Sequence, residues 1–177
     1  PQDLLYGGIS HPLDIMRWLL GDIEEVHAYG NRGGLTPEVK INGNFLLNVK
    51  FVNGTIGRVL GVYDCVHPPM PMMGIGLWGN KGTLMADYTD LKGGHINVVY
   101  DEIEGQPVGT FEFPAETLGA YGHGDTVLRY MRQFADCLEN DREPSPNVRD
   151  GAKSVATCEA AGQSVETGEV VKVRNDF

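Results

Sequence analysis

The stretch that decides the fold is residues 8–26, GISHPLDIMRWLLGDIEEV, where a helix pattern gives way to a strand pattern. Residues 11–20 are predicted to form a helix, because apolar side chains recur on one side and Pro12 suits the first turn, where its missing N–H costs nothing. Gly21 is expected to end this helix. A strand is predicted over residues 23–30, so the fold opens with a helix followed by a strand.

Working outward, the middle of the chain carries a series of strand patterns with no helix between them. The dipeptide Asn53-Gly54 is typical of a type I′ turn in a hairpin. Residues 31–43 are expected to form a loop. Because consecutive strands follow one another directly, we expect them to pair antiparallel. The predicted strands cover residues 45–52, 55–66, 74–78, 83–88, 95–100 and 109–113.

Two helices and a short strand are predicted to close the chain. The first helix is expected over about residues 125–139, where apolar residues recur at helical spacing. The second is expected over about residues 147–167, ended by Gly168 and followed by a strand at 170–173. Together these elements predict an α+β fold with an open, largely antiparallel sheet that carries its helices on one face. Residues 1–177 are interpreted as a single domain.

Composition limits the class of protein. The 177 residues are 41% hydrophobic and 21% charged, which is ordinary for a globular domain long enough to bury a core. The formal net charge of −10 opposes binding to a phosphate backbone, so no nucleic-acid partner is expected. No apolar run approaches the roughly 20 residues of a membrane span, so no membrane partner is expected. Three scattered cysteines without a CxxC pair favour free thiols in a reducing compartment such as the cytoplasm, and they predict no metal site.

One motif matches a cofactor fingerprint by its letters alone. The run Gly74-Ile75-Gly76-Leu77-Trp78-Gly79 fits the dinucleotide-binding pattern GxGxxG. That site needs a strand before the glycines and a helix N-terminus after them to receive the pyrophosphate. Here prolines precede the run, and a second turn leads into another strand. We therefore expect these glycines to lie in a strand where another backbone approaches, and no nicotinamide cofactor to be bound by this chain alone.

His11 is the strongest candidate for a catalytic side chain. Near the start of a helix, which Ser10 or His11 is expected to cap, the positive end of the dipole disfavours the imidazolium form. A neutral histidine there can accept a proton from a substrate hydroxyl. Asp14 lies one helical turn later on roughly the same face, where it can orient a ring nitrogen or bind substrate. The alternative is that His11 only caps or packs.

The run from Gly8 to Val26 resembles the segment that opens the C-terminal domain of the glucose–fructose oxidoreductase, inositol dehydrogenase and MocA-type family. Its recurrent form is a glycine-containing turn, His-x-x-Asp, a helix with aliphatic residues and Trp, then Gly-Asp and a strand. Residues 79–84, 122–125 and 159–168 are similar to later stretches of the family in the same order. The resemblance covers nearly the whole chain.

The resemblance implies a shared active site. An N-terminal Rossmann domain binds NAD or NADP and supplies a lysine, while the C-terminal domain supplies His11 and the substrate pocket. Hydride then passes between the nicotinamide and a sugar, inositol or related polyol. Because the chain begins at Pro1 without an initiator methionine, we expect a piece of a longer protein that is inactive alone. Family members often carry an aspartate four residues before the histidine, where this sequence has Gly7. His11 working alone, a different substrate and lost activity all stay open.

Other polar side chains are candidates for substrate binding. Tyr63, Asp64 and His67 lie where the strand predicted over residues 55–66 leaves the sheet, before Pro68-Pro69, a place where loops often carry function. A solvated strand end is the alternative for these three. Tyr121 and His123 precede the helix predicted over residues 125–139, and they are expected to line the same substrate pocket as His11.

Two alternatives to an active oxidoreductase domain stay open, an oligomerisation module and a sugar-binding pseudoenzyme without turnover. An antiparallel sheet with helices on one side must either cover or solvate its other face. The resemblance implies that this open face packs against its counterpart in another subunit, giving a homodimer or homotetramer. Polar and apolar residues alternate over residues 48–51, which leaves the character of that face open.

Overall fold

The computed structural model describes residues 4–35, 37–38, 40–66, 73–90, 93–100, 109–114 and 124–177. The chain divides into two compact units, Pro1–Val66 with Ser145–Phe177, and His67–Pro144. The predicted α+β class with antiparallel pairing is confirmed, and the strands belong to two four-stranded sheets instead of one. The interpretation of residues 1–177 as one domain stays a prediction.

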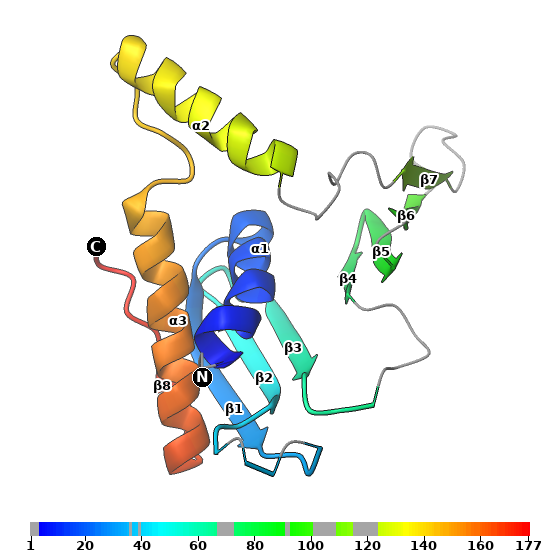
Figure 1. Cartoon of the computed structure of the whole chain (residues 1–177), viewed down its shortest axis with the longest axis vertical. Helices are drawn as coiled ribbons and strands as arrows, with labels where there is room; N and C mark the ends of the chain where they lie inside the picture. Colours follow the sequence, from blue (N-terminus) through cyan, green and yellow to red (C-terminus); the bar gives the residue numbers. More distant parts are fainter. Residues whose placement is uncertain are drawn as a thin grey trace. The chain divides into compact units, whose positions relative to one another are not determined.

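The first unit is an antiparallel sheet with its helices on one face (Figure 1). Its strand order is β3-β2-β1-β8. The early strands alternate buried and exposed residues, so one face of the sheet forms the core under the helices. The strands are β1 (Ile23–Asn31), β2 (Asn44–Phe51), β3 (Ile56–Val62) and β8 (Val171–Lys172), and the helices are η1 (Leu5–Ile9), α1 (Ser10–Leu20) and α3 (Val148–Thr167).

The opening helix begins earlier than the sequence predicts. The π-helix η1 runs directly into α1, so neither Ser10 nor His11 caps a free helix end, and the expected caps are wrong. The Ser10 hydroxyl instead donates to the carbonyl of Tyr6, at 2.6 Å. A physical reason lies in Pro12, which has no N–H and whose ring crowds the carbonyl four residues earlier, at Gly8. The wider π turn over residues 5–9 accommodates this crowding.

The helix ends agree with the sequence. Gly21 ends α1 with φ 90°, and Gly168 ends α3 with φ 74°, both in the positive-φ range that favours glycine. At the start of α3, the Asn147 side chain accepts from the Asp150 backbone N–H, and the Asp150 carboxylate accepts from the Asn147 N–H. This capping box satisfies two helix donors at once.

The hairpin between β2 and β3 is confirmed, but its turn is not type I′. A type I′ turn needs positive φ at both central residues, whereas of the predicted pair only Gly54 has it, at 87°. The Asn53 amide has another use, because it donates to the Leu20 carbonyl at 2.8 Å and accepts from the Thr55 N–H at 3.0 Å. The turn therefore ties the hairpin to the end of α1.

The described residues of the second unit form an antiparallel sheet of order β4-β5-β6-β7 and a helix. The GxGxxG run lies within β4, and a two-residue turn leads from Gly79 to Gly82 and into β5, as predicted. Gly76 faces close side chains, since a Cβ there would lie 2.5 Å from Trp78 and 2.7 Å from the Met85 sulfur. The elements are β4 (Met73–Gly79), β5 (Gly82–Asp90), β6 (Gly93–Tyr100), β7 (Gly109–Pro114) and α2 (Gly124–Glu139).

Candidate functional site

His11 lies in the first turn of α1, on the side that faces away from the sheet. The buried side of this helical segment carries Leu5, Ile9 and Leu13, whereas His11 is exposed. Among the residues that the structure describes, no hydrogen bond or ion pair holds the His11 ring. Within the described part of the chain both ring nitrogens are therefore unoccupied, and a proton-accepting role requires a ring nitrogen that can meet the substrate.

Tyr63 lies against the segment that carries His11. Its backbone follows β3, where its N–H donates to the Gly43 carbonyl at 2.9 Å. Its side chain covers Gly8 in η1 so closely that a Cβ on Gly8 would lie 2.2 Å from the Tyr63 hydroxyl oxygen. Burial raises the pKa of Tyr63 above its ordinary value of 10.0, so at neutral pH the phenol is a hydrogen-bond donor. The structure thus brings two predicted site residues, His11 and Tyr63, to one end of one helical segment.

Asp14 faces another helix. Its carboxylate accepts a hydrogen bond from the Ser154 hydroxyl of α3 at 2.5 Å, and it lies 3.7 Å from the guanidinium of Arg17. Within the described part of the chain, no bond joins Asp14 to His11. The contacts of Asp14 therefore fix α1 on α3, and its predicted role toward substrate stays a prediction.

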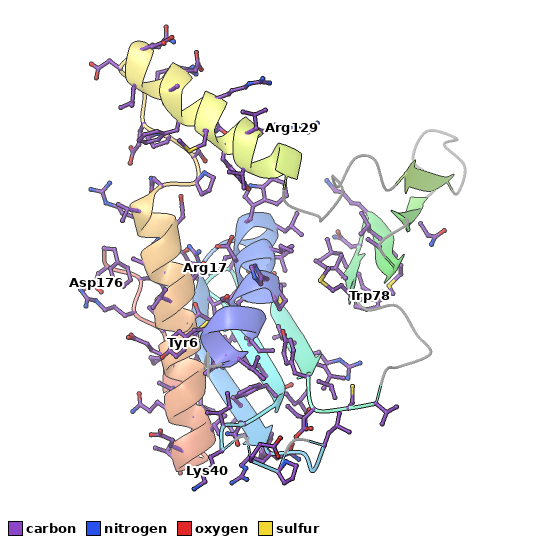
Figure 2. All side chains as sticks on the ribbon, in the orientation of Figure 1. Tyr6, Arg17, Lys40, Trp78, Arg129 and Asp176 are labelled. Atoms are coloured by element: carbon purple, nitrogen blue, oxygen red, sulfur yellow. The ribbon has the colours of Figure 1, made fainter. Side chains whose placement is uncertain are left out.

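Arg17 lies at the centre of the contact between α1 and α3, and its side chain points from α1 toward α3 (Figure 2). It is 8% exposed, and it donates to the Ser154 hydroxyl at 2.8 Å and to the Asp150 carbonyl at 3.0 Å. Asp22 accepts from Arg17 at 3.1 Å and pairs with Lys153 at 2.6 Å. These bonds set the position of α1, and with it the position of His11.

The charges around Asp22 decide its ionisation. Burial by itself raises the pKa of Asp22, but the hydrogen bonds from Lys153 and Arg17 outweigh burial and hold that pKa below its ordinary value. The group is therefore an anion at neutral pH. This ion cluster has a structural role at the base of α1.

Asp64 is held by the loop between β1 and β2. Its carboxylate accepts from the Leu35 N–H at 3.1 Å, and its own N–H donates to the Asn44 side chain at 3.3 Å. A Cβ on Gly33 would lie 2.3 Å from the Asp64 carboxylate, so that glycine lets the loop close over it. Although Asp64 follows Tyr63 in sequence, its bonds to described residues are with this loop and with Asn44 at the start of β2. His67, Tyr121 and His123 lie outside the described residues, so their predicted roles stay predictions.

Sequence reasoning missed Arg17 and Gly61, each of which makes a close contact in the first unit. A signal for Arg17 was present, because Leu5, Ile9, Leu13 and Arg17 recur every four residues and define one helical face. No local signal marks Gly61, whose partner Ile9 is distant in sequence.

The three cysteines are free thiols. Over the described ranges, no group of His, Cys, Asp and Glu side chains could hold a metal ion, and no helix is long and apolar enough to cross a membrane.

Residues 4–173 match a family model described as the C-terminal alpha/beta domain of an oxidoreductase family. No significant match to a curated protein was found. Similar solved structures include an oxidoreductase from Agrobacterium radiobacter in complex with NAD+, L-tartaric acid and magnesium. It is 24% identical with a TM-score of 0.75, over 93% of this chain and 47% of that chain.

Two other solved structures have a similar fold. Levoglucosan dehydrogenase in complex with NADH and levoglucosan is 18% identical with a TM-score of 0.78, over 98% of this chain and 51% of that chain. The WlbA dehydrogenase from Bordetella pertussis, in complex with NADH and UDP-GlcNAcA, is 20% identical with a TM-score of 0.70, over 95% of this chain and 47% of that chain. The chain thus spans about half the length of the solved structures that it matches.

Proposed function

The chain belongs to the glucose–fructose oxidoreductase, inositol dehydrogenase and MocA-type family, as its C-terminal alpha/beta domain, and on that premise we propose that it is the substrate side of an NAD(P)-dependent dehydrogenase. The proposed substrate is a sugar, inositol or related polyol. The observation that carries the proposal is the exposed ring of His11, which has no bond to any described residue and belongs to a residue three positions after Gly8, which Tyr63 covers.

We propose that the cofactor binds to a different part of the protein. The GxGxxG run lies in β4 and is followed by β5, whereas a dinucleotide site needs a helix N-terminus after the glycines. We therefore propose that an N-terminal Rossmann domain of the full-length protein binds NAD or NADP. Bound there, the nicotinamide would supply the hydride acceptor or donor.

The residues of this chain would transfer the proton of the substrate hydroxyl. His11 accepts the proton of the hydroxyl on the carbon being oxidised, and it returns that proton in the reverse direction. The Tyr63 phenol donates a hydrogen bond to a second substrate oxygen and so orients the sugar or polyol. For Asp14 and Asp64 the observed contacts favour supporting roles, to α1 and to the loop between β1 and β2.

Substitution of His11 tests this proposal in the full-length protein. His11→Gln and His11→Ala are expected to lower turnover by roughly 10²–10⁴-fold, with little change in thermal stability, because the ring is exposed and unbonded within the described part of the chain. His27→Gln is the matched control, since His27 contacts the Gly168 carbonyl and Tyr29 on β1. Unchanged turnover in both His11 variants would refute the catalytic role of His11, and a wild-type protein inactive with any polyol and either cofactor would refute the dehydrogenase.

A second function is favoured by one observation. The face of the first sheet opposite its helices carries a row of exposed apolar residues in register, because Leu46 pairs with Tyr29 on one side and with Leu60 on the other. Such a face is typical of an interface. It supports assembly into a homodimer or homotetramer, whether the domain turns over substrate or, as a pseudoenzyme with Gly7 in place of the aspartate, only binds a sugar.

A further inference from the structure

Two glycines, Gly8 and Gly61, lie where β3 and the residue after it pack against the opening helical segment. Each glycine is covered by a side chain from the opposite segment. The buried side chain of Ile9 lies over Gly61, so that a Cβ on Gly61 would lie 2.2 Å from the Ile9 Cδ1. Two residues further along, Tyr63 extends back over Gly8, where a Cβ would lie 2.2 Å from its hydroxyl oxygen and 2.5 Å from Cζ. Each segment therefore lacks a side chain at the point where the other inserts one.

The need for these glycines is spatial. A glycine at positive φ, such as Gly54, is required by its backbone conformation. Gly8 and Gly61 are not among the described glycines at positive φ, so alanine fits their backbones. An added methyl group would collide with the inserted side chain, and it is this collision that glycine avoids.

The contact also determines where the Tyr63 hydroxyl lies relative to His11. The hydroxyl occupies nearly the place that a Cβ of residue 8 would take. Residues three apart on a helix are neighbours, with Cβ atoms about 5–6 Å apart, so the His11 Cβ lies about that far from the Cβ position of residue 8. This spacing allows one small polar molecule to contact both the phenol and the imidazole.

We propose that Gly8 and Gly61 are positioning residues, whose missing side chains set the Tyr63 hydroxyl beside His11. The proposal deepens the proposed function and rests on it, because it takes His11 as the proton acceptor. It adds that a substrate is held by two oxygens at once, one at His11 and one at Tyr63. A methyl group at either glycine would separate these two groups without touching the substrate.

The same strand offers a matched control in Gly57. A Cβ on Gly57 would lie 2.6 Å from the terminal methyl group of Met16. Met16 is flexible and can move aside, and it lies seven residues after Ile9, about two helical turns away. Gly57→Ala therefore adds the same methyl group to the same strand without displacing Tyr63.

Kinetics of the full-length protein test the proposal first. Gly8→Ala and Tyr63→Phe are expected to lower kcat/KM for the polyol about ten- to hundredfold, the value of one hydrogen bond in a site. Affinity for the nicotinamide should not change, because neither residue is proposed to contact it. Gly61→Ala should act in the same direction, and Gly57→Ala should resemble wild type.

A second measurement does not depend on activity. In NMR spectra of this 177-residue chain, the ring-proton signals of His11 should shift in Gly8→Ala and Tyr63→Phe and stay in place in Gly57→Ala. If the wild-type protein oxidises no polyol, the proposed function fails while these spectra still test the contact. Should Gly8→Ala not fold, Tyr63→Phe decides, since it adds no atoms. Wild-type kinetics and unshifted His11 signals in Tyr63→Phe would overturn the proposal.

Discussion

Replacement of Arg17 by methionine removes the charge between α1 and α3 while keeping a side chain of similar length. In the native chain the guanidinium donates to Ser154 at 2.8 Å, to the Asp150 carbonyl at 3.0 Å and to Asp22 at 3.1 Å. Methionine makes none of these bonds. Ser154 and Asp150 lie on α3, so the substitution loosens the attachment of α1 to that helix.

The loss in the free energy of unfolding depends on which bonds the partners of Arg17 keep after the substitution. Breaking a fully buried ion pair costs about 3–5 kcal/mol. Here Asp22 is 32% exposed and keeps Lys153 at 2.6 Å, which limits the charge left unpaired. We therefore expect a loss of about 2–3 kcal/mol in the free energy of unfolding, close to the value of one hydrogen bond to a charged group. For a chain of this length, that loss lowers Tm by about 4–12 °C.

The effect has a pH dependence whose sign can be worked out. The bonds from Lys153 and Arg17 outweigh burial and lower the folded-state pKa of Asp22. Such a group adds stability above its unfolded-state pKa of about 3.9, and this stability is lost as pH falls through the lower folded-state pKa. Arg17→Met weakens that lowering. The variant should therefore lose less stability than wild type on acidification below about pH 4.

Urea unfolding followed by circular dichroism at neutral and acidic pH measures both effects. Arg174→Met is the matched control, because Arg174 is exposed and pairs with Asp176 at 3.0 Å near the C-terminus. Such a surface pair is worth less than about 1 kcal/mol. The reasoning is refuted if Arg17→Met is no less stable than Arg174→Met, or if its acid sensitivity equals that of wild type.

Two further substitutions address the core and the open face of the first sheet. Ser164 is fully buried, accepts from the Ala28 N–H at 2.8 Å and donates to the Glu169 carbonyl at 2.6 Å; Ser164→Ala should therefore cost about 1–3 kcal/mol in urea unfolding, and a loss no larger than that of the exposed Thr167→Ala would contradict it. Leu60→Glu places a charge in the exposed apolar row beside Leu46, so it should shift an assembled wild-type protein toward monomers in analytical ultracentrifugation; a wild-type monomer would argue against this interface.

Local patterns predicted most of the secondary structure, because the features that they depend on lie within a few residues. Gly21 and Gly168 mark helix ends through their own backbone angles, and both were predicted. The alternation in β2 and the turn at Gly54 likewise act over short distances. At Asn53, however, the side chain donates a hydrogen bond to the Leu20 carbonyl, 33 residues away, and the local turn pattern gives no information on such a distant partner. The hairpin was therefore predicted correctly and its turn type was not.

The candidate site depends on contacts between segments that are distant in sequence, and these were harder to predict. His11 was predicted from its place near the start of a helix and from the family pattern around it, and its catalytic role stays a prediction. The hydrogen bond of Asp14 could not be predicted from the sequence, because its partner Ser154 is 140 residues away. The π turn before His11 was not predicted either. Pro12 was expected in the first turn of a helix, where its ring meets no earlier turn, but a helical turn does precede it and the ring crowds the carbonyl of Gly8.

The order in which the first unit is synthesised has a consequence for its folding. Its sheet begins within residues 1–66, but α3, which covers β1, follows the whole second unit. That unit runs from His67 to Pro144, which is 144 − 67 + 1 = 78 residues, or about 4–16 s of translation at ~5–20 residues per second. During that time the nascent chain presents the apolar face of β1 and β2 without α3, although η1 and α1 have already been made. This delay makes the emerging strands a binding site for chaperones and an opportunity for aggregation.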